Sequence, residues 1–294
     1  MKKLLVNRSD TKRYKNSSCN GTVNLIIRKG HRYGNQLFIY FVGRLFAEKY
    51  GLNLLTSLEN TTIKISKNKN FGKAPINNKK YILTDASFDK NANQIKYSGS
   101  GDYYFNGYFQ YETLLYANKE LVDSYVDMNV ENKNLMCLHL RLDDYFNDKR
   151  HLVISIDYYI DCIKKYGQDH HQIVIVCDQL RAEWEKEYMT KLKAKIQSIG
   201  KKPIFSPNTI ENDINIITSS DIIITSNSTF CFWPVFFSKA NKIVSFPYMG
   251  YDVSPNNKVK EWDNKPIIFK QQDDRHISNT SFSANIIDYF EPLY

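Results

Sequence analysis

The sequence of 294 residues lacks several features that would assign it to common classes of protein. Its five cysteines are odd in number, far apart and never in a Cys-x-x-Cys pair, which argues against a disulfide framework and a zinc site. No apolar run is as long as a membrane span, and residues 1–20 are polar, with no signal-peptide core. We therefore expect a soluble, cytoplasmic protein without an integral membrane segment, for which peripheral membrane contact stays open.

Nucleotide-binding motifs are also missing. The glycine-bearing turn at 30–36 is neither Gly-x-Gly-x-x-Gly nor a P-loop, so it predicts neither a dinucleotide site nor an NTPase. The chain has 40 Lys and Arg against 31 Asp and Glu, a formal net charge of +9 that favours phosphorylated or polyanionic partners. Because this excess is spread along the chain without an arginine-rich block, we do not expect nucleic acid as a partner.

The order of predicted elements indicates two α/β domains, at 1–132 and 133–294. Hydrophobic residues make up 42% of the chain, as in folded globular proteins. In the first domain, an apolar strand at 24–28 leads through the turn to an amphipathic helix at 37–50. In the second, strands and helices alternate as in a doubly wound parallel sheet. Its later strands are expected at 172–177, 203–205, 221–225 and 242–246, and its helices at 156–166, 180–199, 211–219 and 229–237.

Two parts of the first domain have less distinct patterns. Residues 57–100 are rich in Asn, Lys and Ser and show little periodicity, so we expect irregular structure there. Residues 103–111 are aromatic and strand-like, and residues 112–126 favour a helix.

The most informative stretch is 135–145, an apolar strand that leads into a His, an Arg and two carboxylates. Alternation along a strand would put His139, Arg141 and Asp143 on one face. A guanidinium at the carboxyl end of a strand is suited to gripping an anion through parallel hydrogen bonds. The plainer interpretations are a surface arginine paired with a nearby aspartate and a buried histidine with satisfied hydrogen bonds.

Two turns between a strand and a helix have chemistry suited to an anion. Residues 225–229 are small and polar, and they join a buried strand to a helix. Such residues cap a helix, and the exposed amides of a helix start can also bind a phosphate. The turn at 30–36 has the same position in the first domain, where Gly34 could take a positive φ or let a ligand approach closely.

Together these segments resemble the α-1,2-fucosyltransferase family, glycosyltransferase family 11 and its relatives. Each motif is weak alone, but their order and spacing agree over roughly 24–262, and the ordered set is specific. The matches are Gly-Arg-Leu-Gly-Asn-Gln-Leu-Phe-Gln-Tyr at 30–40, Gly-Tyr-Phe-Gln at 107–110, His-x-Arg-Arg-Gly-Asp-Tyr at 139–145, Leu-Asp-Tyr-Tyr at 156–159, Ser-Asp at 177–178 and Asn-Ser-Thr-Phe-Ser-Trp-Trp at 227–233.

The resemblance implies a GT-B architecture, in which two facing Rossmann-like lobes hold the active site in the cleft. The lobe of residues 1–132 would take the glycan acceptor, and the lobe of residues 133–294 the nucleotide sugar. The implied reaction is inverting transfer of L-fucose from GDP-β-L-fucose to a sugar hydroxyl, most simply in an α-1,2 linkage. Because the chain contains no Asp-x-Asp, the diphosphate would be neutralised by arginine and a helix start, without a metal or another cofactor.

The matched motifs imply a set of site residues. Those assigned to the donor are His139, Arg141, Asp178, Asn227, Ser228 and Thr229. Those assigned to the acceptor side of the cleft are Arg32, Asn35, Gln36 and Asp144. The expected catalytic residues are Arg141, His139 and His31. His31 stands where the family usually has Gly, so it could accept a proton, contact a sugar hydroxyl or cap the following helix.

The chain also departs from the family pattern at Tyr33, Leu142, Asp143 and Phe232. Leu142 stands where a second Arg is usual, which leaves one cation fewer near the site and leaves the donor and linkage open. One alternative is a transferase of the same fold that uses a different nucleotide sugar. Another is a noncatalytic protein that binds polysaccharide or nucleic acid through its positive charge.

Overall fold

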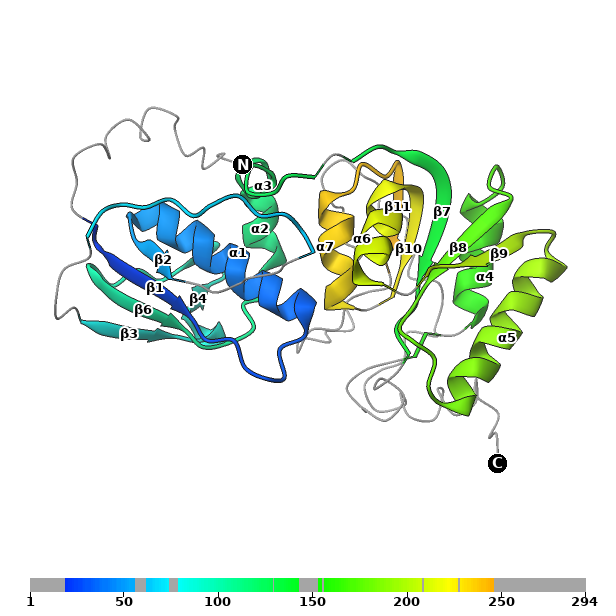
Figure 1. Cartoon of the computed structure of the whole chain (residues 1–294), viewed down its shortest axis with the longest axis horizontal. Helices are drawn as coiled ribbons and strands as arrows, with labels where there is room; N and C mark the ends of the chain where they lie inside the picture. The colour runs from blue at the N-terminus through cyan, green and yellow to red at the C-terminus, as the bar shows by residue number, and fades with distance from the viewer. Residues whose placement is uncertain are drawn as a thin grey trace. The chain divides into compact units, whose positions relative to one another are not determined.

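The computed structural model describes residues 19–55, 62–73, 79–128, 130–142, 153–154, 156–207, 209–226 and 228–245. The chain divides into two compact units, Met1–Met128 and Asn129–Tyr294. Each unit contains a parallel sheet with helices packed on it (Figure 1). The mixed α/β class expected from the sequence is therefore confirmed. The expected GT-B arrangement of two facing lobes stays a prediction.

The first unit has a four-stranded sheet in the order β2-β1-β6-β3, with all neighbours parallel. The strands are β1 (Gly21–Leu25), β2 (Asn53–Leu55), β3 (Lys80–Leu83) and β6 (Gly101–Phe105). The helices are α1 (Tyr33–Tyr50), α2 (Glu112–Ala117) and α3 (Lys119–Asp123), and the short elements between β3 and β6 are η2 (Asp85–Ser87), β4 (Phe88–Asp89) and β5 (Gln94–Ile95).

Helix α1 joins β1 to β2 and buries most of its middle turns. It ends at Gly51, whose φ of 65° is the left-handed conformation that glycine adopts at low cost and whose N–H donates to Ala47 O. The helix begins at Tyr33, four residues before the predicted start. Gly34 therefore lies in the first helical turn and does not take the positive φ considered for it.

A buried arginine holds α1 to the segments around it. The Arg44 guanidinium donates to Tyr40 Oη at 3.0 Å, to Ser66 O at 2.8 Å and to Glu48 at 3.1 Å. It also stacks over the Tyr125 ring, 3.8 Å from the centroid. Such partners offset the cost of burying a charge, so Arg44 fixes the helix that carries part of the first unit's candidate site.

Three expectations for the first unit are corrected. The irregular structure expected over 57–100 is wrong for β3, an edge strand in which Ile82 is 69% exposed, so no apolar run marked it. The strand expected over 103–111 ends at Phe105. The helix expected over 112–126 is broken at Asn118, whose side chain donates to Leu114 O.

The second unit has a five-stranded sheet in the order β11-β10-β7-β8-β9, again with all neighbours parallel. The strands are β7 (Lys133–His139), β8 (Gln172–Val176), β9 (Lys202–Phe205), β10 (Ser220–Thr225) and β11 (Lys242–Ser245). The helices are α4 (Ile156–Tyr166), α5 (Glu183–Ser198), α6 (Ile210–Ser219) and α7 (Thr229–Phe237). This is the predicted doubly wound alternation, with element ends within a few residues.

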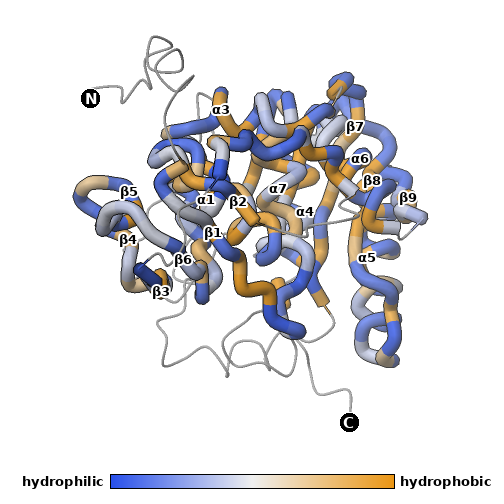
Figure 2. Tube along the Cα trace, turned by 60° about the vertical axis from the view of Figure 1, so that its left-hand side comes forward, coloured by the Kyte–Doolittle hydropathy of each residue, from blue (hydrophilic) through white to orange (hydrophobic). Residues whose placement is uncertain are grey.

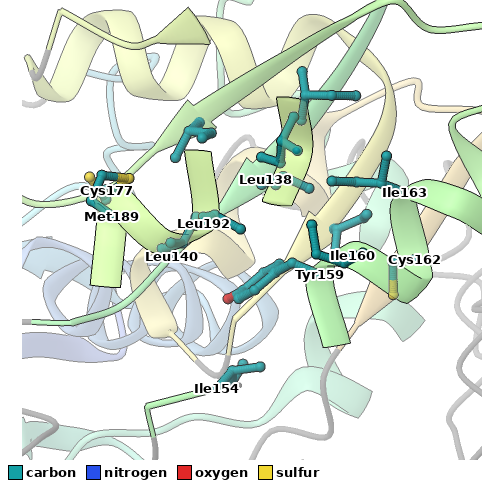
Figure 3. Packing of buried hydrophobic residues seen from close by; sticks show 14 of the residues in the cluster. Leu138, Leu140, Ile154, Tyr159, Ile160, Cys162, Ile163, Cys177, Met189 and Leu192 are labelled. Carbon is teal, nitrogen blue, oxygen red and sulfur yellow. The ribbon is translucent and has the colours of Figure 1, made fainter. Parts of the chain in front are cut away.

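Both faces of this sheet are covered, which explains its nearly continuous apolar strands. Along β7, Leu138 faces α4 and α5, whereas Cys137 faces α6 and α7. Figure 1 shows the two helix pairs on opposite sides of the sheet, and Figure 3 shows Leu138 packed with Tyr159, Ile160 and Ile163 of α4. Figure 2 shows hydrophilic and hydrophobic residues mixed along α5, as expected of a helix with one face in water. None of the helices in the described part of the chain is long and apolar enough to cross a membrane.

Candidate functional site

The strand order of the second unit defines where a ligand is expected to bind. From β7 the chain proceeds through β8 to β9 on one side, and then returns to β10 and β11 on the other. The connections after β7 and β10 therefore leave towards opposite faces, which makes this pair of central strands the topological switch point. In open α/β sheets, ligands bind beyond the carboxyl ends of the strands at such a point.

His139 and Ser226 join the two central strands at this edge. His139 is the last residue of β7 and Ser226 follows β10, and His139 Nδ1 lies 2.8 Å from Ser226 Oγ. The ring also stacks near Phe230 of α7, with 5.9 Å between centroids, and the His139 carbonyl accepts from Tyr159 Oη. Burial lowers the pKa of His139 from 6.5 to about 3, so the ring is neutral at neutral pH.

Arg141 lies two residues beyond β7, and Asp178 lies two residues beyond β8. Their side chains form an ion pair through Arg141 Nη1 and Asp178 Oδ2. The Arg141 side chain is only 9% exposed, whereas that of Asp178 is 46% exposed. The ion pair therefore holds a sheltered cation at the carboxyl edge of the sheet, next to a carboxylate that reaches solvent.

The start of α7 lies at the same edge. Ser228 is the N-cap residue, and its Oγ accepts from the backbone N–H of Phe230 at 3.3 Å. Thr229 is the first residue of the helix. The capping function expected for this segment is therefore present, and the partial positive charge of a helix start faces the carboxyl ends of the strands.

The candidate residues of the first unit lie where β1 leads into α1. His31 is buried just before the helix, Arg32 is its N-cap residue, and Asn35 and Gln36 lie in its first turn. Gln36 Nε2 donates to His31 O at 2.7 Å, and Asn35 Oδ1 accepts from Gln110 Nε2 at 2.9 Å. Both amides thus tie the start of α1 to a neighbouring loop.

His31 has a defined hydrogen-bond state. Its Nδ1 accepts from the backbone N–H of Arg28 at 3.3 Å, so the neutral ring carries its hydrogen on Nε2. Burial and the Arg28 guanidinium lower the pKa of His31 below 6.5, against a raising effect of Asp85. This geometry favours a hydrogen-bond donor at Nε2 over a general base.

Some candidate residues are not positioned by the structure. Asp143, Asp144 and Asn227 lie outside the described residues. Elsewhere, the described ranges contain no group of three or more His, Cys, Asp and Glu side chains placed to hold a metal ion.

Residues 27–265 match the family model for glycosyl transferase family 11. The chain belongs to this family. The resemblance seen in the sequence is therefore confirmed, and membership implies fucosyltransferase activity with a nucleotide sugar and a glycan acceptor. A comparison with curated proteins finds no match.

In this member of glycosyl transferase family 11, the structure also reveals polar residues that the sequence analysis did not assign to the site. Ser226 holds His139, and Ser206, directly after β9, donates through its hydroxyl to the carboxylate of Asp213 in α6. Burial and the nearby charge of Asp178 raise the pKa of Asp213, while the Ser206 hydrogen bond opposes that rise. The signal for Asp213 was a carboxylate at a core position of helix 210–219, three residues before the buried Ile216–Ile217 pair.

The neutral, buried His139 predicts how the stability of this family member depends on pH. Because its pKa is about 3 in the folded protein and 6.5 in the unfolded chain, only the unfolded chain binds a proton between these values. The contribution is complete above pH 6.5 and is lost as the pH falls towards 3. At about pH 5 the loss from His139 should be about 2 kcal/mol.

Urea unfolding of the wild type and of His139→Gln at about pH 7.5 and about pH 5 measures this difference. The variant should lose about 2 kcal/mol less on acidification than the wild type. His171→Gln, which alters an exposed histidine, should retain the wild-type dependence. An equal dependence in the wild type and His139→Gln would contradict neutral burial of His139.

Proposed function

We propose that the chain catalyses inverting transfer of L-fucose from GDP-β-L-fucose to a sugar hydroxyl, forming an α-1,2 linkage in a GT-B arrangement. The second unit would bind the nucleotide sugar and the first unit the acceptor. Family membership supports fucosyl transfer. The observation that carries the donor assignment is the sheltered Arg141 guanidinium beside the start of α7, at the carboxyl edge of a doubly wound sheet.

The chemistry needs positive charge where the leaving group forms. The bond between the fucose anomeric carbon and the β-phosphate oxygen breaks, and its electron pair leaves on GDP. The acceptor oxygen attacks the opposite face of the anomeric carbon and loses its proton. A guanidinium and a helix start that already point at the diphosphate stabilise the developing charge without reorganising, and this is the kind of term that lowers a barrier most.

The other donor residues have supporting roles in this proposal. Asp178 orients the Arg141 guanidinium through the observed ion pair, and its exposed carboxylate is available to the ribose or guanine. Ser228 and Thr229 supply the hydroxyls at the start of α7. His139 Nδ1 is engaged by Ser226, while Nε2 has no hydrogen-bond partner in the described part of the chain and can serve the donor.

Proton removal from the acceptor needs less help than departure of GDP. When the anomeric carbon carries much of the positive charge, the attacking hydroxyl becomes acidic only late in the reaction, so a strong base is not required. This view is supported by His31, whose Nδ1 is engaged by the Arg28 amide. We therefore assign His31 to binding of the acceptor.

The second candidate is a transferase of the same fold with another nucleotide sugar. It is favoured by Leu142, which replaces the family's second Arg and is buried in the apolar core of the second unit. That position contributes no cation to the diphosphate here, so the donor depends more strongly on Arg141.

A panel of nucleotide sugars, followed by mass spectrometry of hydrolysis and transfer products, tests the donor. We expect turnover of GDP-fucose and selective thermal stabilisation by GDP over UDP and ADP. Turnover of a UDP-sugar alone would support the second candidate. Stabilisation by heparin without turnover of any donor would instead indicate a noncatalytic polyanion-binding protein.

Arg141→Ala should reduce transfer by about a hundredfold or more while leaving the fold intact, because the charge on departing GDP loses its guanidinium. Arg141→Lys should also be severely impaired, since a point charge does not reproduce the bidentate fork. Activity per folded molecule, with folding checked by circular dichroism, measures the effect. Lys186→Ala, at an exposed position of α5, is the matched control for loss of a positive charge. Near-normal activity of either Arg141 variant would remove the central assignment.

Activity should survive chelation by EDTA, because Arg141 and the helix start are proposed to neutralise the diphosphate in place of a metal. The rate of GDP release is measured before and after dialysis against EDTA, and again with added manganese or magnesium. A complete loss of activity that either metal restores would show that this account of leaving-group stabilisation is wrong.

A further inference from the structure

Tyr108, in the family's Gly-Tyr-Phe-Gln motif, has no role in the chemistry described above. It lies in the loop at 106–111 that follows β6, while His31 lies in the loop at 26–32 that follows β1. These two strands are parallel neighbours, so both loops leave the same carboxyl edge of the first unit's sheet. The loops are also joined directly, since Arg28 Nη2 donates to Asn106 Oδ1.

The loop at 106–111 has a backbone that displays Tyr108. Phe109 has a φ of 52°, a left-handed conformation that costs a non-glycine residue about 1–2 kcal/mol. The Asp85 carboxylate offsets this cost by accepting the N–H of Tyr108 at 3.1 Å and that of Phe109 at 2.6 Å. The Phe109 ring is fully buried against Phe105, whereas Tyr108 is turned outward and is 36% exposed.

The Tyr108 ring stands beside the imidazole of His31. Their centroids are 4.9 Å apart and their planes are tilted by 52°. The Arg28 amide fixes the hydrogen of His31 on Nε2, which has no hydrogen-bond partner among the described residues. An exposed aromatic face therefore lies next to one directed donor.

The position of this pair is set before any ligand binds. Arg28 to Asn106 and Gln110 to Asn35 cross between the two loops, and Asp85 holds the backbone of the second. Loops held in this way lose little conformational entropy on binding, so even a weak ligand contact contributes to affinity.

We propose that Tyr108 and His31 form a subsite for one ring of the acceptor sugar. A pyranose has an apolar face of C–H groups and a rim of hydroxyls, so its face packs on the Tyr108 ring while a hydroxyl oxygen accepts from His31 Nε2–H. Because the family usually has Gly at position 31, this donor is a feature of the present chain and would contribute to its choice of acceptor. The inference rests on the proposed transfer to a sugar hydroxyl.

Sugar binding by the full-length chain tests the platform without requiring turnover. Lactose, cellobiose and N,N′-diacetylchitobiose are titrated while saturation-transfer NMR records which sugar protons contact the protein. The sugar that binds the wild type should bind Tyr108→Ala about three- to tenfold more weakly, because an aromatic contact is lost. Tyr108→Phe should bind like the wild type, and so should Tyr116→Ala, which removes a partly buried tyrosine from α2.

The donor role of His31 needs its own pair of variants. His31→Phe retains a ring beside Tyr108 but removes the N–H, and should weaken sugar binding about two- to tenfold. His31→Gln retains a donor and should recover part of that loss. In all of these variants, hydrolysis of GDP-fucose without acceptor should remain within about twofold of the wild type, since neither residue belongs to the donor assignment.

The subsite is overturned if the wild type binds none of the three sugars, or if Tyr108→Ala binds them as the wild type does. A wild type that binds sugar but neither hydrolyses nor transfers fucose from GDP-fucose would overturn the proposed function instead. The two failures are therefore separate observations.

Discussion

The parallel pairing of β7 with β10 is the constraint on which the second unit's candidate site depends. These strands come from distant parts of the chain, and the connections after them leave towards opposite faces of the sheet. His139 and Ser226 close the seam at its carboxyl end with a buried hydrogen bond. Arg141 lies two residues beyond one partner and Ser228 two residues beyond the other, so a shift in the register of this pair would separate the guanidinium from the start of α7.

The second unit was largely predictable because its sheet is covered on both faces. Buried strands such as Ile173–Val176 are continuous apolar runs, and the amphipathic period of α4 gave its bounds, Ile156–Tyr166, as predicted. The first unit offered weaker signals. β3 is an edge strand with exposed Ile82, and Asn118 ends α2 through a side-chain hydrogen bond that no periodicity indicates.

The candidate site divides in the same way. Sequence motifs named Arg141, Asp178 and Ser228 individually, because each follows a strand or begins a helix. They did not reveal which groups would meet. Asp178 is 37 residues from Arg141, and Ser226 is 87 residues from His139, so these pairings follow from strand order and not from local pattern. Asp213 was missed for the same reason, since its partner Ser206 lies on the preceding strand connection.

The two histidines at the carboxyl edges share a physical state that bears on the proposed chemistry. Each is buried with Nδ1 engaged by a local partner, and burial lowers the pKa of each below the usual 6.5. Both rings are therefore neutral near pH 7, and the cationic charge assigned to the diphosphate comes from a guanidinium that does not titrate in this range. The field acting on departing GDP would then be constant across physiological pH. The histidines would contribute directed hydrogen bonds, which require a fixed tautomer and not a charge.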